Sequence, residues 1–170
     1  MKVKPRLTFL FIVLFQVLIL AGLVGFNEAA IATGKTVVLQ TVPVDPRDIF
    51  RGDYVALRYE ISRLKNVPGL ELIKEGGRAY VHLGQHGNVW EAVEVSDARV
   101  KGWEVVISGE VTGIYNGNYE IKYGIEEYFV PEDKGLEIQR AEDIKVLAIV
   151  DGSGRAMIKN LMVDGEIFQP

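Results

Sequence analysis

The chain has 170 residues, no cysteine, and 19 basic against 23 acidic residues, which gives a formal net charge of −4. Without cysteine, disulfides, thiolate metal ligands and cysteine nucleophiles are excluded. Three of the basic residues, Lys2, Lys4 and Arg6, precede a long apolar segment, so the part from Asn27 to Pro170 carries 16 basic and 23 acidic side chains. That part has a net charge of −7, which argues against a nucleic acid as partner.

Residues 7–26 form a run of 20 residues without a charged side chain. As a helix this run would be about 30 Å long, enough to cross the hydrocarbon core of a bilayer. The basic residues before it favour a cytoplasmic N-terminus. The sequence therefore predicts a single-pass membrane protein, with cytoplasmic residues 1–6, a lipid-embedded helix at 7–26, a tether at 27–35 and an extracytoplasmic domain at 36–170. Cleavage stays open as an alternative, because Ala30-Ile31-Ala32 resembles a signal-peptidase site.

The first elements after the tether are predicted to be a strand at 36–42 and a single helical turn. Asp45 suits the N-cap of that turn, and Pro46 suits its first helical position. A second strand follows Gly52-Asp53. Its alternation places one set of residues on one face (Val55, Leu57, Tyr59 and Ile61) and the other set on the opposite face (Tyr54, Ala56, Arg58 and Glu60).

The rest of the domain also reads as strands separated by glycine turns. Strands are predicted at 78–83, 88–95, 103–115, 119–123, 144–150, 155–163 and 166–168, with turns at 84–87, 116–117, 151–154 and 164–165. Gly109 or Gly113 is expected to mark a bulge in the longest strand. One short helix is predicted at 131–143. The predicted fold is mainly β, an antiparallel β-barrel or sandwich with one short helix, preceded by the transmembrane helix.

Two longer motifs carry a family resemblance. The first motif segment, residues 45–59, ends in Gly-Asp-Tyr-Val-Ala-Leu-Arg-Tyr, and the second motif segment, residues 123–132, reads Tyr-Gly-Ile-Glu-Glu-Tyr-Phe-Val-Pro-Glu. In this order, after an apolar N-terminus and before a terminal hairpin, they resemble the GDYXXLXY family of membrane-anchored bacterial and archaeal proteins. The resemblance covers essentially the whole chain. It implies a membrane-anchored protein found beside polytopic membrane proteins, and it implies no reaction, cofactor or catalytic residue.

The first motif segment concentrates polar side chains, and two interpretations of them stay open. Arginine suits bidentate contacts with carboxylates and tyrosine supplies rigid contact area, so the segment could bind a ligand or a partner protein. Alternatively, Asp45, Gly52 and Asp53 only shape a corner of the backbone. With the second segment, the candidate surface comprises Asp45, Arg47, Asp48, Arg51, Gly52, Asp53, Tyr54, Leu57, Arg58, Tyr59, Tyr123, Gly124, Glu126 and Tyr128.

Charge balance predicts that the two motif segments meet in the folded domain. Alternation points one glutamate of the second segment inward, and an inward Glu126 needs a partner, for which Arg58 or Arg47 is suitable. The two histidines, His82 and His86, do not share a helical face and have no cysteine beside them, so the sequence predicts no metal site and no cofactor.

Two functions follow from these observations. The favoured hypothesis is an interaction or accessory module for another membrane protein. The alternative is a small-molecule or cell-envelope enzyme that uses Asp53 and Glu126 as paired carboxylates.

Overall fold

The computed structural model of the chain describes residues 5–42, 54–100, 102–131, 138 and 141–169. The chain divides into two compact units, residues 1–34 and residues 35–170, and we call the second unit the β domain. Several predicted features lie outside the described residues. These are the predicted helical turn, the candidate residues Asp45, Arg47, Asp48, Arg51, Gly52 and Asp53, and most of the predicted helix at 131–143.

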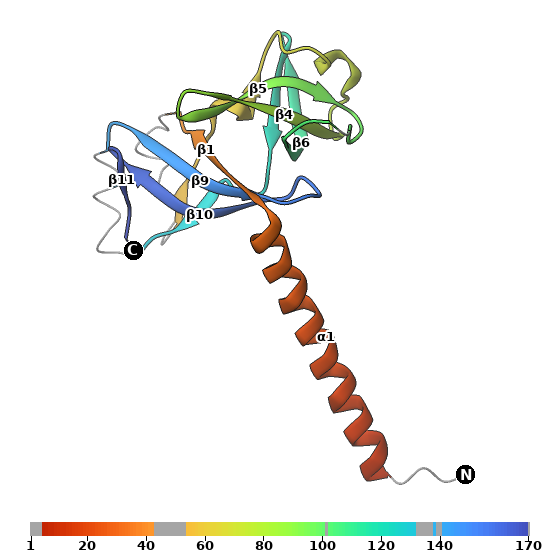
Figure 1. Cartoon of the computed structure of the whole chain (residues 1–170). Helices are drawn as coiled ribbons and strands as arrows, with labels where there is room; N and C mark the ends of the chain where they lie inside the picture. The colour runs from red at the N-terminus through yellow and green to blue at the C-terminus, as the bar shows by residue number, and fades with distance from the viewer. Residues whose placement is uncertain (1–4, 43–53, 101, 132–137, 139–140, 170) are drawn as a thin grey trace. The chain divides into compact units, whose positions relative to one another are not determined.

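The first unit contains one helix, α1 (Pro5–Thr33; Figure 1). Phe9, Leu10, Phe11 and Ile12 are all exposed, and four consecutive positions point to all sides of a helix. No helix within the described residues is both long enough and apolar enough to cross a membrane. The helix itself is thus confirmed, whereas a transmembrane span at 7–26 is not supported. Most of the predicted tether is also helical, since residues 28–32 read Glu-Ala-Ala-Ile-Ala, a sequence that favours helix.

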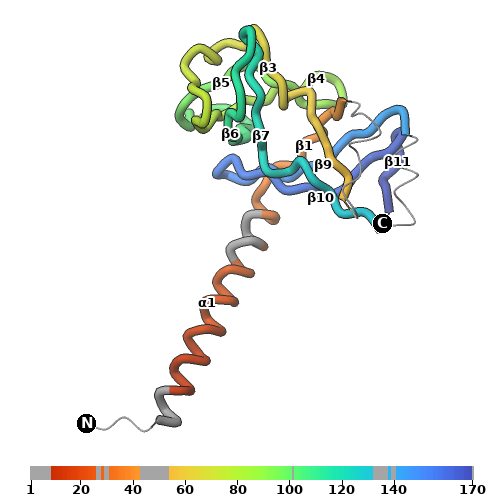
Figure 2. Tube along the Cα trace, turned by 180° about the vertical axis from the view of Figure 1, so that it is seen from behind, coloured from red at the N-terminus to blue at the C-terminus, as the bar shows by residue number. Residues whose placement is uncertain are grey.

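The β domain consists of short and medium antiparallel strands (Figures 1 and 2). They are β1 (Lys35–Gln40), β2 (Tyr54–Ala56), β3 (Arg63–Leu64), β4 (Arg78–His86), β5 (Val89–Ser96), β6 (Val105–Tyr115), β7 (Asn118–Lys122), β8 (Glu127–Phe129), β9 (Ile144–Val150), β10 (Ala156–Val163) and β11 (Glu166–Ile167). Two single-turn 3-10 helices, η1 (Glu60–Ser62) and η2 (Leu70–Leu72), flank β3. The mainly β fold is confirmed.

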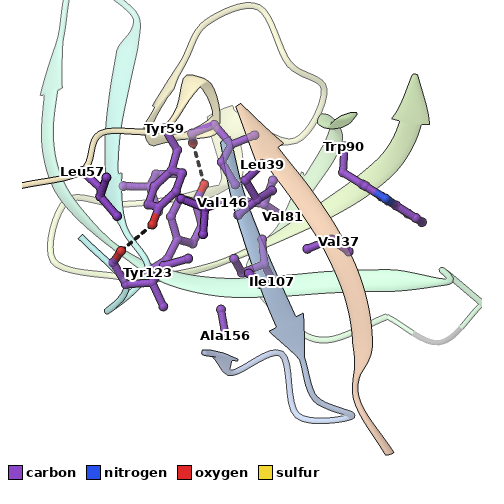
Figure 3. Packing of buried hydrophobic residues seen from close by; sticks show 14 of the residues in the cluster. Val37, Leu39, Leu57, Tyr59, Val81, Trp90, Ile107, Tyr123, Val146 and Ala156 are labelled. Carbon is purple, nitrogen blue, oxygen red and sulfur yellow. Dashed lines mark hydrogen bonds between the residues drawn. The ribbon is translucent and has the colours of Figure 1, made fainter. Parts of the chain in front are cut away.

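The strands form three hydrogen-bonded sheets, with the orders β1-β9-β10-β11, β2-β8 and β3-β7-β6-β4-β5. Side chains from the two larger sheets fill one core, in which Leu39, Val81, Ile107 and Val146 lie close together (Figure 3). The sheet arrangement is a curled half-barrel. Register shifts at His82/Leu83, Val111/Gly113 and Ile158/Asn160 mark the irregular points of the ladders, and such bulges bend strands. The bulge predicted in the longest strand is therefore present, beside Gly113.

The hairpin turns follow from local sequence. Asn116 and Gly117 have φ angles of 52° and 75°, and Asp164 and Gly165 have 49° and 90°. Two successive positive φ angles are the geometry of a two-residue type I′ turn, which Asn-Gly and Asp-Gly favour. The connection after β4 is shorter than predicted, because the ladder with β5 continues to His86 and Val89. Of the predicted helix at 131–143, Ile138 is buried and Ala141 packs against the core.

Gly69 gives a test of how closely the backbone packs near η2. Its φ is +87°, and a Cβ atom there would lie 1.8 Å from the carbonyl oxygen of Val95. We expect Gly69→Ala to lower the free energy of unfolding of the β domain by more than about 2 kcal/mol, because both strain and a backbone clash result. Urea denaturation measures this. The control is Gly152→Ala, because a Cβ atom added at Gly152 meets nothing within 4 Å, and it should cost less than about 0.5 kcal/mol. Equal losses of unfolding free energy in the two variants would contradict the packing described.

Candidate functional site

The two motif segments lie side by side, as predicted. In β2 and β8, Tyr54 pairs with Phe129 and Ala56 pairs with Glu127. Beyond the strands, the amide of Leu57 donates a hydrogen bond to the carbonyl of Glu126 at 2.7 Å. Segments that are about seventy positions apart in the sequence therefore form one continuous backbone junction.

Two buried tyrosines join the segments reciprocally, and we call them the tyrosine clasp. The hydroxyl of Tyr59 donates to the carbonyl of Ile125 at 2.5 Å, and the hydroxyl of Tyr123 donates to the carbonyl of Ile61 at 2.6 Å (Figure 3). Burial, and then the nearby charge of Glu126, raise the pKa of both tyrosines well above the usual value. The hydroxyls therefore stay protonated and remain donors.

The clasp changes the interpretation of three candidate residues. Tyr59 and Tyr123 are 1% and 7% exposed, and Leu57 is buried beside them. These side chains belong mainly to the core of the domain, although Leu57 also lines a groove beside the junction and Tyr123 lines a second hollow. Their place in the motifs is explained by packing and by the two buried hydrogen bonds.

Glu126 is held by its own turn. One carboxylate oxygen accepts the amide of Tyr123 at 2.5 Å, and the other accepts the amide of Gly124 at 2.9 Å. Gly124 has a φ of +80°, which aims its amide at the carboxylate. The predicted ion pair with Arg58 is absent from the described residues, because two local amides already satisfy the charge. Arg47, the other predicted partner, lies outside the described residues.

A groove of about 460 Å³ runs along the junction. Its charged lining is balanced, with three cations (Arg58, Arg63 and Lys122) and three anions (Glu120, Glu126 and Glu127). Arg63 and Glu120 pair with each other at 2.8 Å. Within the described part of the chain, the side chain of Arg58 forms neither a hydrogen bond nor an ion pair, so its guanidinium is available at the groove.

An exposed aromatic pair lies at the same place. The rings of Tyr54 and Phe129 are 5.6 Å apart between centroids in an edge-to-face arrangement. Tyr54 is 48% exposed and lines the groove, and Phe129 is 54% exposed. Tyr128, a predicted surface residue, is half-buried against the core instead. Among the described strands, β2 and β8 pair only with each other.

Comparison with known proteins identifies the family of the chain. A family model described as GDYXXLXY protein matches residues 16–161. The chain belongs to the GDYXXLXY family. No curated protein matches it, and no solved structure matches it.

In this GDYXXLXY protein, sequence reasoning missed several residues of the groove region, and Phe129 and Lys122 show why. Phe129 was left out of the candidate surface, although alternation from Glu127 places it on the exposed face of β8. Lys122 lines the groove from β7, a strand that belongs to neither motif segment. The signal for Phe129 was present in the sequence, whereas the position of Lys122 depends on how the sheets meet.

The histidines are separate from the junction. His82 is buried, with its Nε2 3.0 Å from the hydroxyl of Ser96 and its ring 4.9 Å from that of Trp103. Its Nδ1 has no hydrogen-bond partner in the described structure and lies 4.0 Å from a carboxylate oxygen of Glu94. His86 is exposed. The described residues contain no group of three side chains that could hold a metal ion.

The tyrosine clasp can be tested by removing its hydroxyls. Tyr59→Phe or Tyr123→Phe leaves a buried carbonyl without its donor, which should lower the free energy of unfolding by about 1–3 kcal/mol. Because both hydrogen bonds hold one junction, the double variant should deviate from additivity by about 0.5–3 kcal/mol. Urea denaturation of the β domain measures both effects. Tyr115→Phe, at an exposed tyrosine, should cost less than about 0.5 kcal/mol, and a similar cost for Tyr59→Phe would refute the clasp.

His82 should make the fold sensitive to mild acid. Burial lowers its pKa, and the charge of Glu94 opposes this shift without cancelling it. The unfolded chain takes up this proton near pH 6.5, where folded His82 stays neutral, so stability should fall as the pH drops below about 6.5. The urea midpoint measured between pH 7.5 and 5 should show this fall in the unmodified domain and in His86→Gln. In His82→Gln the fall should be smaller; an unchanged slope would contradict the assignment.

Proposed function

We propose that this GDYXXLXY protein is a membrane-attached binding module whose β domain engages another membrane protein outside the cytoplasm. The observation that carries the proposal is the exposed Tyr54–Phe129 pair beside a groove lined by Arg58, whose guanidinium has no ion-pair partner among the described residues. The pair and the groove both lie at the junction of the motif segments.

The chemistry of this surface suits a protein partner. Aromatic side chains and arginines dominate the energetics of protein interfaces, because they bury large rigid areas. Tyr54 and Phe129 supply adjoining rings, and Arg58 offers a planar guanidinium to a carboxylate. The partner segment expected from this surface carries an apolar or aromatic side chain next to an acidic one.

Membrane attachment is proposed from α1. Its apolar side chains are exposed on all sides from Phe9 to Val24, and covering them with lipid or with an apolar protein surface removes them from water. Lys2, Lys4 and Arg6 precede this segment and favour a cytoplasmic N-terminus, which would leave the β domain outside.

No observation favours the alternative of an enzyme with paired carboxylates. Both oxygens of Glu126 accept backbone amides, so this carboxylate serves the turn. Asp53, the other proposed carboxylate, lies outside the described residues. The binding module is therefore the function that the geometry supports best.

Cross-linking in intact cells tests the proposal. A membrane-impermeant cross-linker should join the full-length chain to a membrane protein that mass spectrometry identifies. The double variant Tyr54→Ala/Phe129→Ala should lose that product, because losing interface residues of this kind costs about 2 kcal/mol or more, roughly 30-fold in affinity. Arg58→Ala should weaken it as well.

The control for this experiment is Tyr115→Ala, which removes an exposed aromatic ring on the hairpin between β6 and β7. It should keep the cross-linked product. A chain that begins at Lys35 should leave the membrane fraction. Retention of the product by the Tyr54→Ala/Phe129→Ala variant, with cooperative unfolding preserved, would exclude the junction as the binding surface.

A further inference from the structure

A second hollow, of about 630 Å³, lies apart from the aromatic pair and gathers positive charge. Four cations line it: Arg78, Arg99, Lys122 and Arg155. Glu110 is the one acid in the described lining, so the hollow carries a local charge of about +3. This contrasts with the net charge of −7 for residues 27–170.

The sheet register brings two of these cations together. Arg78 of β4 is opposite Glu110 of β6, and Glu110 is opposite Lys122 of β7. Directly opposite residues of antiparallel strands point to the same face, so Glu110 lies between two basic side chains. Within the described residues, none of the four cations forms an ion pair, although the carboxylate of Asp151 attracts Arg155 from outside the lining. Two carboxylates still leave a surplus of positive charge at the hollow.

The third cation, Arg155, lies in the turn between β9 and β10, two strands of another sheet. Asp151, at the start of the β9–β10 turn, accepts the amide of Ser153 at 2.7 Å and the amide of Arg155 at 3.0 Å. The turn is fixed to β6, because the amide of Ser108 donates to the carbonyl of Gly154 at 2.8 Å. The hydrogen bonds of the turn thus hold the backbone of Arg155 at the hollow.

Electrostatics indicates which kind of ligand the hollow favours. Like charges held in one hollow repel one another, and an anion bound among them replaces repulsion by attraction. Guanidinium groups bind the oxygens of phosphate in pairs, and Tyr80, which carries a hydroxyl donor, lines the same space. A surplus of about three positive charges suits a dianion better than a single carboxylate.

We propose that this hollow binds a phosphate-type dianion, either a phosphate monoester of a lipid headgroup or a soluble phosphate. The site goes beyond the proposed function, since it needs neither the Tyr54–Phe129 pair nor a protein partner. Lys122 connects the hollow with the groove at the motif junction, because it lines both.

The test uses the full-length chain in an uncharged detergent, at constant ionic strength. Inorganic phosphate should raise the melting temperature in a saturable way, and chloride should not. Arg78→Ala and Arg155→Ala should each weaken phosphate binding at least tenfold. Lys159→Ala, which removes an exposed charge from β10 outside the hollow, is the matched control and should bind as the unmodified chain does.

Further measurements keep the test decisive. Arg155→Lys preserves the charge, and its phosphate affinity should lie between those of the unmodified chain and Arg155→Ala. This intermediate affinity separates loss of the site from loss of the fold. Short-chain phosphatidic acid and glycerol 3-phosphate, titrated separately, distinguish a lipid from a soluble source. The Tyr54→Ala/Phe129→Ala variant should still bind phosphate, so failure of the protein-binding proposal would be seen independently. The proposal would be overturned if none of the three phosphates raised the melting temperature in a saturable way. It would also be overturned if Arg78→Ala and Arg155→Ala showed the same shift in melting temperature as the unmodified chain.

Discussion

The structure of the β domain depends on the need of buried tyrosine hydroxyls for a hydrogen-bond acceptor. In the tyrosine clasp, Tyr59 finds it in the carbonyl of Ile125 in the second motif segment. Tyr123 finds it in the carbonyl of Ile61, two residues after the first motif segment. Strands β2 and β8 have only three residues each, too few to hold together alone. The clasp therefore fixes both the contact between the segments and their register.

The same constraint defines the outer surface of the junction. Once Val55 and Tyr59 point into the core, alternation turns Tyr54 and Arg58 outward, toward the groove. On the paired strand, Phe129 points outward beside Tyr54. A single-residue slip would bury Tyr54 and expose Val55, so the core and the proposed binding surface cannot change independently.

The sequence was informative wherever structure is decided by near neighbours. Alternation placed Val55, Leu57, Tyr59 and Ile61 inward, and Asn116-Gly117 predicted its turn, because both depend on local backbone geometry. The Arg58–Glu126 pair was wrong because charge balance does not reveal that the amides of Tyr123 and Gly124 already bind the carboxylate. The basic hollow was missed for a related reason. Its cations come from β4, the loop after β5, β7 and the β9–β10 turn, and sequence spacing does not show that these meet.

Lys122 joins the electrostatics of the two surfaces. This residue lines both the groove and the basic hollow, and its ammonium forms no ion pair within the described structure. A dianion in the hollow attracts this ammonium and lowers the positive potential at the groove, which Arg58 shares. An acidic group of a partner in the groove attracts the same ammonium toward the groove and lowers the positive potential at the hollow. Because coupling between sites is reciprocal, each ligand would then weaken the other, and neutral substitution of Lys122 would reduce that coupling while leaving the aromatic pair and the clasp in place.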